Sequence, residues 1–382
     1  MTFIPLIFYW FSFTLLLFAY ALYPIILWLI GQFIKTDSKK YNNIQPFVTI
    51  LIAAHNESNI IKEKIENCLS LDYPAEKMEI IIVSDGSSDN TANICREFNN
   101  FRVVIHELVE RVGKTEAQNI GVEISNGEII IFSDANAMYK HDAVKRIVER
   151  FSDELIGCVS GRLVYQNSGF TNTVAEVEAN YWKMESWLKS AESKLNILTG
   201  ANGSIYALRK DLYVKLEKEI ISDLIEPLHI MEQGFRFVYE PHAISTEISS
   251  KNINLEFNRK RRIVKRSIYG MFKNLRFLNP AKFGFLSIAL FFHKIVRWLT
   301  PFLGLIMFGS SITLLHLTWH YYTLVTFLSI LSLGLLGLLL PHNLSPKIIK
   351  SLAYLLVIAF AGLLAGIESI FGKSETIWEP KR

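Results

Sequence analysis

Long stretches without a single charged side chain lie at both ends of this chain, and they limit its possible folds more than any other feature. Residues 1–34 contain no Asp, Glu, Lys or Arg, and neither do residues 298–346 and 351–367. A helix of about 20 apolar residues crosses a bilayer. The first stretch therefore predicts one transmembrane helix, and residues 298–371 predict about three. These three are expected near Thr300–Leu317, Thr323–Leu340 and Leu352–Ile370.

The central part of the chain, residues 35–250, has the charge density of a water-soluble domain and is long enough to bury a full core. A basic segment at 251–297 follows beside the membrane, and residues 372–382 form a tail. Lys35, Lys39 and Lys40 come directly after the first apolar stretch, so the positive-inside rule places the central domain in the cytoplasm. We therefore expect an integral protein of the cell (inner) membrane that contacts membrane lipids.

The net charge of this chain, +4, is too small and too scattered for a nucleic-acid-binding protein. Its one dense basic cluster, residues 259–266, lies next to the predicted membrane entry. One interpretation of this cluster is a surface for anionic lipids. The other is that Arg262 reaches into a binding site and binds a diphosphate with two parallel hydrogen bonds.

Apolar strand-like runs alternate with helix-like runs through the first half of the central domain. Strands are predicted at 48–54, 78–83, 103–105 and 128–132, and helices at 57–69, before Phe98 and at 114–124. Short connections between alternating strands and helices are typical of a parallel sheet covered by helices on both faces. The sequence therefore predicts an α/β domain.

Asp134-Ala135-Asn136 directly follows the last of these strands and suggests a metal site. Residues two apart in an extended segment point the same way, so Asp134 and Asn136 can share one cation. Carboxylate and amide oxygens are the ligands that a hard divalent ion such as Mg²⁺ prefers. The alternative is a turn in which the side chain hydrogen-bonds its own backbone.

Polar residues also end the other strands, at the edge where open α/β sheets bind ligands. His55, Asn56 and Glu57 follow the first strand, and Asp85 ends the second. Each acid could be a helix cap, but three acids at one edge favour a binding site. Gly86 fits a backbone that approaches a ligand closely. The chain has neither the glycine pattern of dinucleotide-binding folds nor that of P-loops.

A second set of candidate residues lies near Asp223, where a helix is predicted with Pro227 in its first turn. Asp223 is either a helix cap or a general base that takes the proton of an incoming hydroxyl. The small, polar segment 198–204 suits a surface for a second substrate, because its backbone is accessible. Gly200, Ala201 and Asn202 are its candidate acceptor-binding residues.

These segments resemble motifs of the membrane-bound glycosyltransferases of family 2, which include cellulose, hyaluronan and poly-N-acetylglucosamine synthases. The similarity runs from about Val48 to Arg266 and continues into His293–Pro301. Residues 54–57 resemble the opening nucleotide-binding segment, and 84–91 the Asp-Asp-Gly-Ser loop. The matching functional positions are Lys114 of the Gly-Lys…Asn helix, Asp134 and Asn136 of the Asp-x-Asp metal motif, and Asp223 of the Thr-Glu-Asp motif.

The resemblance implies a GT-A-like fold with transmembrane helices at both ends, and an inverting transfer of a sugar from a nucleoside-diphosphate sugar, with a UDP-sugar favoured. It implies Mg²⁺ or Mn²⁺ on Asp134 and Asn136, Asp223 as the base, and a glycan or lipid-linked acceptor at 200–202. The residues implied to bind the nucleotide-sugar are Ala54, His55, Asn56, Glu57, Asp85, Lys114, Asp134 and Arg262.

Three positions depart from the family pattern. Asn136 replaces the second Asp of the metal motif, Ser222 replaces the Glu before Asp223, and Ile263 replaces the Trp of Gln-x-x-Arg-Trp. Because that Trp stacks near the acceptor sugar of a growing polymer, its loss favours transfer of a single sugar. The alternatives are a processive polysaccharide synthase, a polyprenyl-phosphate glycosyltransferase and a non-catalytic membrane module that binds nucleotide-sugars.

Asp134 carries the only full charge in its motif, so Asp134→Ala is expected to abolish nucleotide-sugar binding that depends on a divalent ion. Calorimetry with nucleotide-sugar in the presence of Mg²⁺ measures this. An affinity equal to that of the unchanged protein would remove Asp134 from the site.

Overall fold

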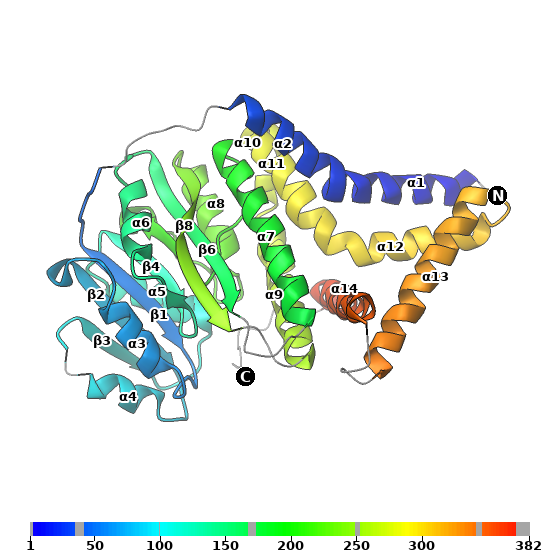
Figure 1. Cartoon of the computed structure of the whole chain (residues 1–382). Coiled ribbons are helices and arrows are strands. Elements are labelled where there is room, and N and C mark those ends of the chain that lie inside the picture. Colours follow the sequence, from blue (N-terminus) through cyan, green and yellow to red (C-terminus); the bar gives the residue numbers. More distant parts are fainter. Residues whose placement is uncertain are drawn as a thin grey trace.

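The computed structural model describes residues 3–34, 42–98, 100–166, 173–248, 253–340 and 346–371. The orientation prediction from Lys35, Lys39 and Lys40 and the predicted tail at 372–382 concern residues outside these ranges. Figure 1 shows a globular part, built on a sheet with helices on both faces, joined to an arm of long helices.

The predicted alternation of strands and helices in the first half of the domain is confirmed. Its elements are β1 (Val48–Ala54), α3 (Ile61–Leu69), β2 (Met78–Asp85), α4 (Thr91–Glu97), β3 (Val103–Leu108), α5 (Lys114–Ile124) and β4 (Ile129–Asp134). Several boundaries differ by up to four residues. Strands β2, β3 and β4 extend to Asp85, Leu108 and Asp134, beyond their predicted ends, and α3 begins at Ile61 instead of Glu57. Ile60 is the N-cap of α3, because its φ of −130° is not helical.

The second half of the domain adds antiparallel strands and longer helices. They are β5 (Met138–Tyr139), α6 (Ala143–Arg150), β6 (Ile156–Gln166), α7 (Thr173–Lys194), β7 (Ile205–Arg209), α8 (Ser222–Glu232), β8 (Arg236–Ile248) and α9 (Ile253–Lys273). The prediction that Pro227 lies in the first turn of its helix is wrong. Because α8 begins at Ser222, Pro227 lies inside the helix.

Within the described residues, the strands form one sheet of eight in the order β3-β2-β1-β4-β7-β6-β8-β5. Strands β3, β2, β1 and β4 are parallel to one another, and β7 is antiparallel to both β4 and β6. In this register Ala53 of β1 lies beside Asp134, and Ala54 lies beside Ser84. Asp85, Asp134 and the residues after β1 are therefore level at one edge.

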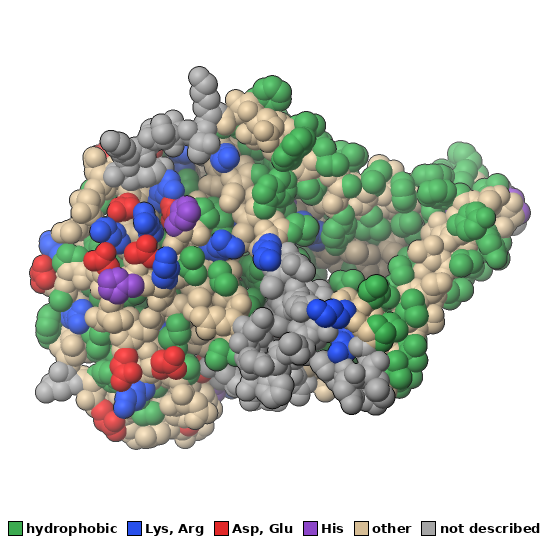
Figure 2. Space-filling model, viewed as in Figure 1, with side chains coloured by type: hydrophobic (Ala, Val, Ile, Leu, Met, Phe, Trp, Pro, Cys, Tyr) green, Lys and Arg blue, Asp and Glu red, His purple; other side chains and the backbone are tan. Residues whose placement is uncertain are grey.

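Among the described residues, four helical runs are long and apolar enough to cross a membrane: Phe3–Phe33, Phe285–Thr313, Thr318–Leu339 and Lys347–Ile370. The first combines α1 (Phe3–Leu17), a π-helical turn at Phe18–Leu22 and α2 (Tyr23–Phe33). The second combines α11 (Phe285–Leu290), a π-helical turn, η5, at Phe291–Ile295 and α12 (Val296–Thr313). Helices α13 (Thr318–Leu339) and α14 (Lys347–Phe371) complete the arm. Figure 2 shows charged side chains gathered on the globular part and hydrophobic ones along the arm.

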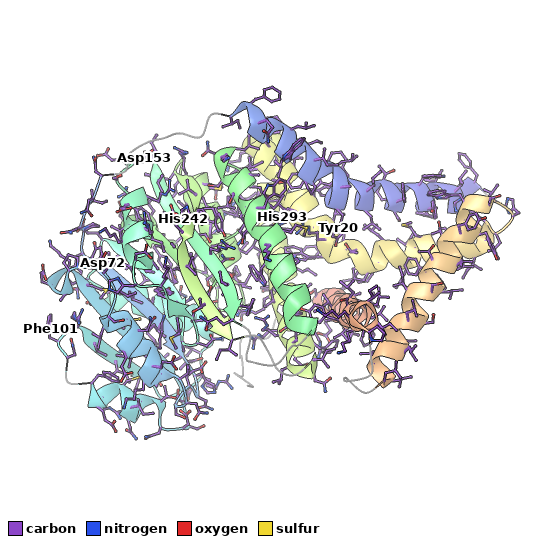
Figure 3. The ribbon with its side chains drawn as sticks, viewed as in Figure 1. Tyr20, Asp72, Phe101, Asp153, His242 and His293 are labelled. Carbon is purple, nitrogen blue, oxygen red and sulfur yellow. The ribbon has the colours of Figure 1, made fainter. Side chains whose placement is uncertain are left out.

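The arm joins the domain through a shared apolar cluster. This cluster includes Tyr23 and Leu27 of α2, Leu224 and Leu228 of α8, and Leu290 of α11. In Figure 3, Tyr20 and His293 lie at this junction, far from Asp72 and Phe101 at the outer end of the domain. The helix that carries Asp223 is therefore packed directly against the apolar helices.

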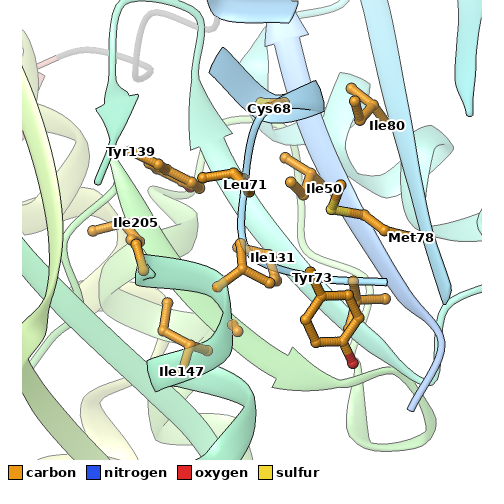
Figure 4. Packing of buried hydrophobic residues seen from close by; sticks show 14 of the residues in the cluster. Ile50, Cys68, Leu71, Tyr73, Met78, Ile80, Ile131, Tyr139, Ile147 and Ile205 are labelled. Atoms are coloured by element: carbon orange, nitrogen blue, oxygen red, sulfur yellow. The ribbon is translucent and has the colours of Figure 1, made fainter. Parts of the chain in front are cut away.

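The core of the domain is divided by the sheet because strand side chains alternate between its two faces. Ile50 and Ile52 of β1 point to the face that α3, α4 and α6 cover, where they pack with Ile131 and Ile147. Figure 4 shows part of this cluster. Leu51 points to the opposite face, which α5 and α8 cover. Every residue of β1 is buried, as a strand in the middle of such a sheet requires.

Candidate active site

Asp85 positions the start of helix α5. Its Oδ1 accepts a hydrogen bond of 2.7 Å from the backbone N–H of Val112, and its Oδ2 one of 3.1 Å from that of Gly113. Asp85 is fully buried. Both carboxylate oxygens are thus used inside the protein, so Asp85 acts on a ligand through the Val112–Gly113 turn and the residue that follows, Lys114.

Lys114 is the first residue of α5, and its ammonium contacts the carboxylate of Asp134 at the end of β4. Their side chains are 22% and 32% exposed, respectively, so the pair is open to a ligand. The structure therefore brings together two predicted site residues that are 20 positions apart in the chain. An ammonium beside an acid at a strand edge is suited to binding phosphate oxygens together with a cation.

The residues after β1 form a compact loop with the residues after β2. Nδ1 of His55 lies 2.7 Å from the carbonyl oxygen of Asp85, and the side-chain oxygen of Asn56 accepts a 2.8 Å bond from the N–H of Ser88. The N–H of Glu57 donates to the hydroxyl of Thr91 at 2.8 Å. These contacts give His55 and Asn56 a definite scaffolding role at the edge of the sheet.

Gly86 was predicted to let the backbone approach a ligand closely, but the structure shows it packed against another segment of the protein. Gly86 has a φ of 56°, and a Cβ there would lie 2.9 Å from the backbone nitrogen of Arg111. The space that a side chain would fill is therefore taken by the 110–111 segment of the protein. Glycine is required for this close packing and for the left-handed backbone, and neither requirement concerns a ligand.

Pro227 leaves the backbone carbonyl of Asp223, at the start of α8, free to accept a hydrogen bond from outside the helix. Proline has no N–H, so it cannot make the helical bond to the carbonyl four residues earlier, which is that of Asp223. The N–H of Ala201 donates to this carbonyl instead, at 2.8 Å. The proline inside α8 thus connects the candidate base to the segment predicted to bind the acceptor.

The carboxylate of Asp223 faces this same segment. A Cβ at Gly203 would lie 2.9 Å from Oδ2 of Asp223 and 3.7 Å from Nζ of Lys114. Gly203 therefore marks a place where the two predicted halves of the site meet. Any larger residue there would fill the space between the base and the lysine.

Lys189 of α7 forms hydrogen bonds with the 198–204 segment. Its Nζ donates to the carbonyl oxygen of Ala201 at 3.1 Å and to Oδ1 of Asn202 at 2.7 Å. Asn202 is buried and also donates to the carbonyl oxygen of Gly161. Of the three predicted acceptor residues, Asn202 is thus a buried scaffold, while the backbone at Gly200 lies near Lys294 of η5.

Helix α5 also fixes the segment that leads to Asp223. The hydroxyl of Thr115 donates to the carbonyl oxygen of Ile220 at 2.7 Å, and Ser222 donates to Gln118 at 2.7 Å. The amide of Asn119 donates to the carbonyl oxygen of Leu216 at 2.9 Å. The lysine and the base are therefore positioned by one helix.

Arg266 of α9 joins this network, while the role of Arg262 in binding a diphosphate stays a prediction. Arg266 donates to the hydroxyl of Thr115 at 2.8 Å and to the carbonyl oxygen of Ile220 at 2.7 Å. Burial and the nearby charge of Arg262 lower the pKa of Arg266 to about 10. Arg262 lies about one turn earlier in the same helix and is partly exposed.

Burial is the largest influence on the pKa values of Asp223 and Lys189. Loss of hydration raises the pKa of Asp223, the positive charges of Lys114 and Lys189 oppose this rise, and the charge of Asp134 adds to it. Burial lowers the pKa of Lys189 to about 8. An aspartate with a raised pKa is a stronger proton acceptor than an ordinary one, as a general base requires.

Asp134 and Asn136 offer oxygen ligands that fit half of a divalent-ion site. The amide nitrogen of Asn136 donates to Glu247 at 3.4 Å, which leaves the amide oxygen available to a cation. The fully buried Lys64 fixes the turn that follows, because its Nζ donates to the carbonyl oxygen of Ala137 at 2.5 Å. The part of the chain that the structure describes has no group of three His, Cys, Asp or Glu side chains placed for a metal. A bound diphosphate would supply the remaining ligands.

Glu226 is a buried acid that sequence reasoning missed. It is 1% exposed, its Oε2 accepts a 2.7 Å bond from the hydroxyl of Tyr206, and burial raises its pKa to about 8. Lys189 and Lys294 were missed as well. The only signal in the sequence was the resemblance of residues 293–301 to the family, because these contacts form between distant segments.

Comparisons with known proteins show what this chain resembles. Residues 49–216 match the model of the glycosyl transferase family 2. This range includes Asp85, Lys114 and Asp134 and ends before Asp223. The resemblance seen in the sequence is therefore confirmed over residues 49–216.

Two curated relatives cover more of the chain. A poly-beta-1,6-N-acetyl-D-glucosamine synthase of Staphylococcus aureus is 30% identical over 254 residues, which is 61% of this chain and 60% of the relative. A probable glycosyltransferase of Bacillus subtilis, YdaM, is 26% identical over 296 residues, covering 75% of this chain and 70% of the relative. The chain thus spans about 60% of the length of the staphylococcal synthases it matches.

The fold is also that of a solved structure. The mannosyltransferase PcManGT from Pyrobaculum calidifontis, in complex with GDP-Man and Mn²⁺, superimposes with a TM-score of 0.67. The two sequences are 20% identical, and the match covers 93% of this chain and 99% of the other. The predicted GT-A-like architecture, with a mainly parallel sheet and apolar helices at both ends, is confirmed.

The raised pKa of Glu226 predicts a pH-dependent stability. Between the ordinary carboxyl pKa of 4.5 and about 8, the unfolded chain has released a proton that the folded chain keeps, so stability falls as the pH rises through this window. Glu226→Gln keeps the oxygen that accepts from Tyr206 and has no proton to lose. Its melting temperature should therefore fall less than that of the unchanged protein between pH 5 and pH 8. Glu154→Gln, at an exposed site, is the control, and a variant that matches this control at both pH values would contradict the prediction.

Proposed function

We propose that this chain, whose residues 49–216 match the model of the glycosyl transferase family 2, is a membrane-bound inverting glycosyltransferase. It moves a sugar from a nucleoside-diphosphate sugar to a glycan or lipid-linked acceptor at the membrane. The observation that carries this proposal is the meeting of Lys114, Asp134 and Asp223. A phosphate-binding pair and a base with a raised pKa lie on the two sides of Gly203.

The donor nucleotide binds at the carboxyl edge of β1, β2 and β4. The loop that Asn56 and Ser88 form and the Val112–Gly113 turn shape this edge, and Glu57 lies directly beside it. The ammonium of Lys114 binds the diphosphate and stabilises the negative charge that develops as the nucleoside diphosphate leaves. The complex of PcManGT with GDP-Man supports a nucleotide-sugar as the donor, and the similarity to the glucosamine polymer synthases favours a UDP-sugar.

Asp134 and Asn136 would hold a divalent ion, Mg²⁺ or Mn²⁺. Their oxygen atoms match the preference of both ions, and Mn²⁺ is present in the complex of PcManGT. When bound, the ion supplies positive charge to the diphosphate. With one carboxylate instead of two in the motif, this chain depends more strongly on Lys114 for that charge.

Asp223 takes the proton of the acceptor hydroxyl as this hydroxyl attacks the anomeric carbon. The attack comes from the face opposite the leaving diphosphate, so the configuration at that carbon inverts. Burial raises the pKa of Asp223, which favours transfer of the proton to it. The bond from Ala201 to the Asp223 carbonyl keeps the base beside the acceptor segment.

The acceptor approaches from the membrane side. Helix α8, which carries Asp223, packs against α2 and α11 of the apolar arm. The basic residues of α9 support a domain on the cytoplasmic side of the cell membrane, because residues that flank membrane spans on that side are enriched in Lys and Arg. Ile263 offers no flat ring for a polymer to stack on, which favours transfer of one or a few sugars over processive synthesis.

A panel of nucleotide-sugars tests the proposal with the purified full chain. Release of nucleoside diphosphate is measured with membrane lipid extract, in Mn²⁺, in Mg²⁺ and with a chelator. One donor should give release that requires the divalent ion and the acceptor extract. Binding of a nucleotide-sugar without release from any donor would support the non-catalytic alternative instead.

Asp223→Asn should separate binding from transfer. The amide keeps the size of the side chain but accepts no proton, so transfer should fall by roughly 10²–10⁴-fold while nucleotide-sugar affinity changes little. Initial rates and calorimetry on the same preparation measure the two quantities. Transfer that stays within a few-fold of the original rate would show that Asp223 is a helix cap and that the base lies elsewhere.

The product should carry one or a few added sugars. Mass spectrometry of the lipid and glycan fractions, after reaction in excess donor, counts them. An indole can stack on a sugar ring and Ile263 cannot, so the purified chain should stop early. A ladder that extends to long polymer would favour the processive synthase.

A further inference from the structure

A buried cluster of charges lies between the candidate active site and the apolar arm. On the side of the arm it contains His293, Lys294 and Arg297, and on the side of α7 it contains Glu185 and Glu192. Figure 3 shows His293 behind α7, at the junction with the arm. Charged side chains this close to an apolar span are costly and commonly mark a functional site.

Both ring nitrogens of His293 face carboxyl groups. Its Nδ1 lies 2.6 Å from Oε1 of Glu192, and its Nε2 lies 3.1 Å from Oε1 of Glu185. Glu192 also accepts hydrogen bonds from the hydroxyls of Tyr23 and Thr199. His293 therefore joins the two glutamates of α7 to the helix that carries Arg297.

Glu185 is the carboxylate that the basic side chains of this cluster share. Burial would raise the pKa of Glu185, but His293, Lys294 and Arg297 together keep it well below its usual range, so it is ionised. All three basic side chains lie within 4 Å of its oxygen atoms. One carboxylate cannot satisfy the donors of all three.

Arg297 is the cation whose hydrogen bonds are incomplete. Its Nη1 donates to Oε2 of Glu185 at 3.2 Å, and its side chain is 12% exposed. Within the part of the chain that the structure describes, its Nε and Nη2 are buried and have no hydrogen-bond partner. A buried donor without an acceptor is destabilising, so these two nitrogens point to a ligand with oxygen acceptors.

The position of Arg297 relates this missing acceptor to the reaction. Nζ of Lys294 would lie 3.7 Å from a Cβ at Gly200, beside the segment that faces Asp223. Arg297 is three residues further along the helix, about 4.5 Å along its axis, and belongs to the apolar run Phe285–Thr313. Its guanidinium also faces the ring of Tyr20 of the first run, 5.7 Å from the ring centre.

We propose that Arg297 binds the phosphate group of a lipid acceptor, whose chain lies in the membrane and whose sugar or hydroxyl end points toward Gly200 and Asp223. The planar guanidinium can donate two parallel hydrogen bonds to phosphate oxygens. This inference rests on the proposed function, because it names the class of acceptor for the same site. It supplies acceptors for the two unpartnered nitrogens of Arg297.

The test measures binding to the full chain in phosphatidylcholine nanodiscs by native mass spectrometry. The probes are a polyprenyl phosphate, the polyprenol of the same chain length, phosphatidylglycerol and inorganic phosphate. We expect the polyprenyl phosphate to bind at least 10-fold more tightly than each of the other three. Arg297→Gln should remove most of this preference.

Two further variants serve as controls for the binding experiment. Arg297→Lys keeps the charge beside Glu185 but loses the paired donors, so it should fold as the unchanged protein does and show an intermediate preference. Arg276→Gln removes an arginine from the exposed ion pair with Glu232 and should leave the preference unchanged. Equal binding of the polyprenol and its phosphate, or an undiminished preference in both Arg297 variants, would overturn the proposal. So would equally tight binding of phosphatidylglycerol or inorganic phosphate.

The donor site is measured separately, so the two proposals can fail independently. Arg297→Gln should keep the nucleotide-sugar affinity of the unchanged protein, because Lys114 and Asp134 are intact. If the unchanged protein bound no nucleotide-sugar, the proposed function would be refuted. Normal donor binding without phosphate preference would refute only the assignment of Arg297.

Discussion

The two hydrogen bonds that Asp85 accepts from the N–H groups of Val112 and Gly113 are the interaction on which the site depends most. They fix the start of α5 to the end of β2 in the interior of the domain. From this start, Lys114 reaches Asp134, and the next turns of α5 bind the backbone that leads to Asp223. A buried carboxylate with two backbone donors is stable because both of its oxygens are satisfied. The hydrogen bonds of Asp85 thus position both halves of the candidate site, the one predicted for the donor and the one predicted for the acceptor.

Pro227 has a comparable effect on the other half of the site. By leaving the carbonyl of Asp223 without a helical donor, it makes that carbonyl available to Ala201. Lys189 then fixes the far side of the same segment. The base and the segment that faces the acceptor therefore move as one unit. A conventional residue at 227 would satisfy the helix and release the segment.

The junction with the arm places Asp223 close to the apolar helices. Helix α8 shares its apolar cluster with α2 and α11, so Asp223 lies beside helices that are long and apolar enough to cross a bilayer. The side chains of His293, Lys294 and Arg297 enter this junction on a π-helical turn and the helix after it. Such turns widen the helix and are frequent at functional sites. The proposed lipid acceptor with an anionic group depends on these basic side chains within the apolar run Phe285–Thr313.

Local patterns in the sequence were sufficient for the strands, the helices and the apolar spans. An unbroken apolar strand such as β1 and a charge-free run such as residues 1–34 each have few alternative structures, because burial or a bilayer must cover them. The acids at the ends of β2 and β4 were expected at one edge, because the carboxyl ends of parallel strands meet at the same edge of a sheet. The ends of several strands, the start of α3 and the position of Pro227 differed from the prediction. The reason for Gly86 differed too, because the distant segment 110–111 packs against it.

Tertiary structure alone decided how those residues are used. Asp85 is an acid at a strand end in the sequence, but burial against the 112–113 turn makes it a positioning residue. Arg262 and Arg266 are equivalent in a helical pattern, and only the packing of α9 against α5 brings Arg266 to Thr115. Glu226 and Arg297 resemble ordinary surface charges in the sequence and are buried in the fold. The sequence by itself determined which segments are apolar and where charges begin, since these depend on neighbours along the chain. Partners, hydration and protonation depend on neighbours in space, and those exist only once the chain has folded.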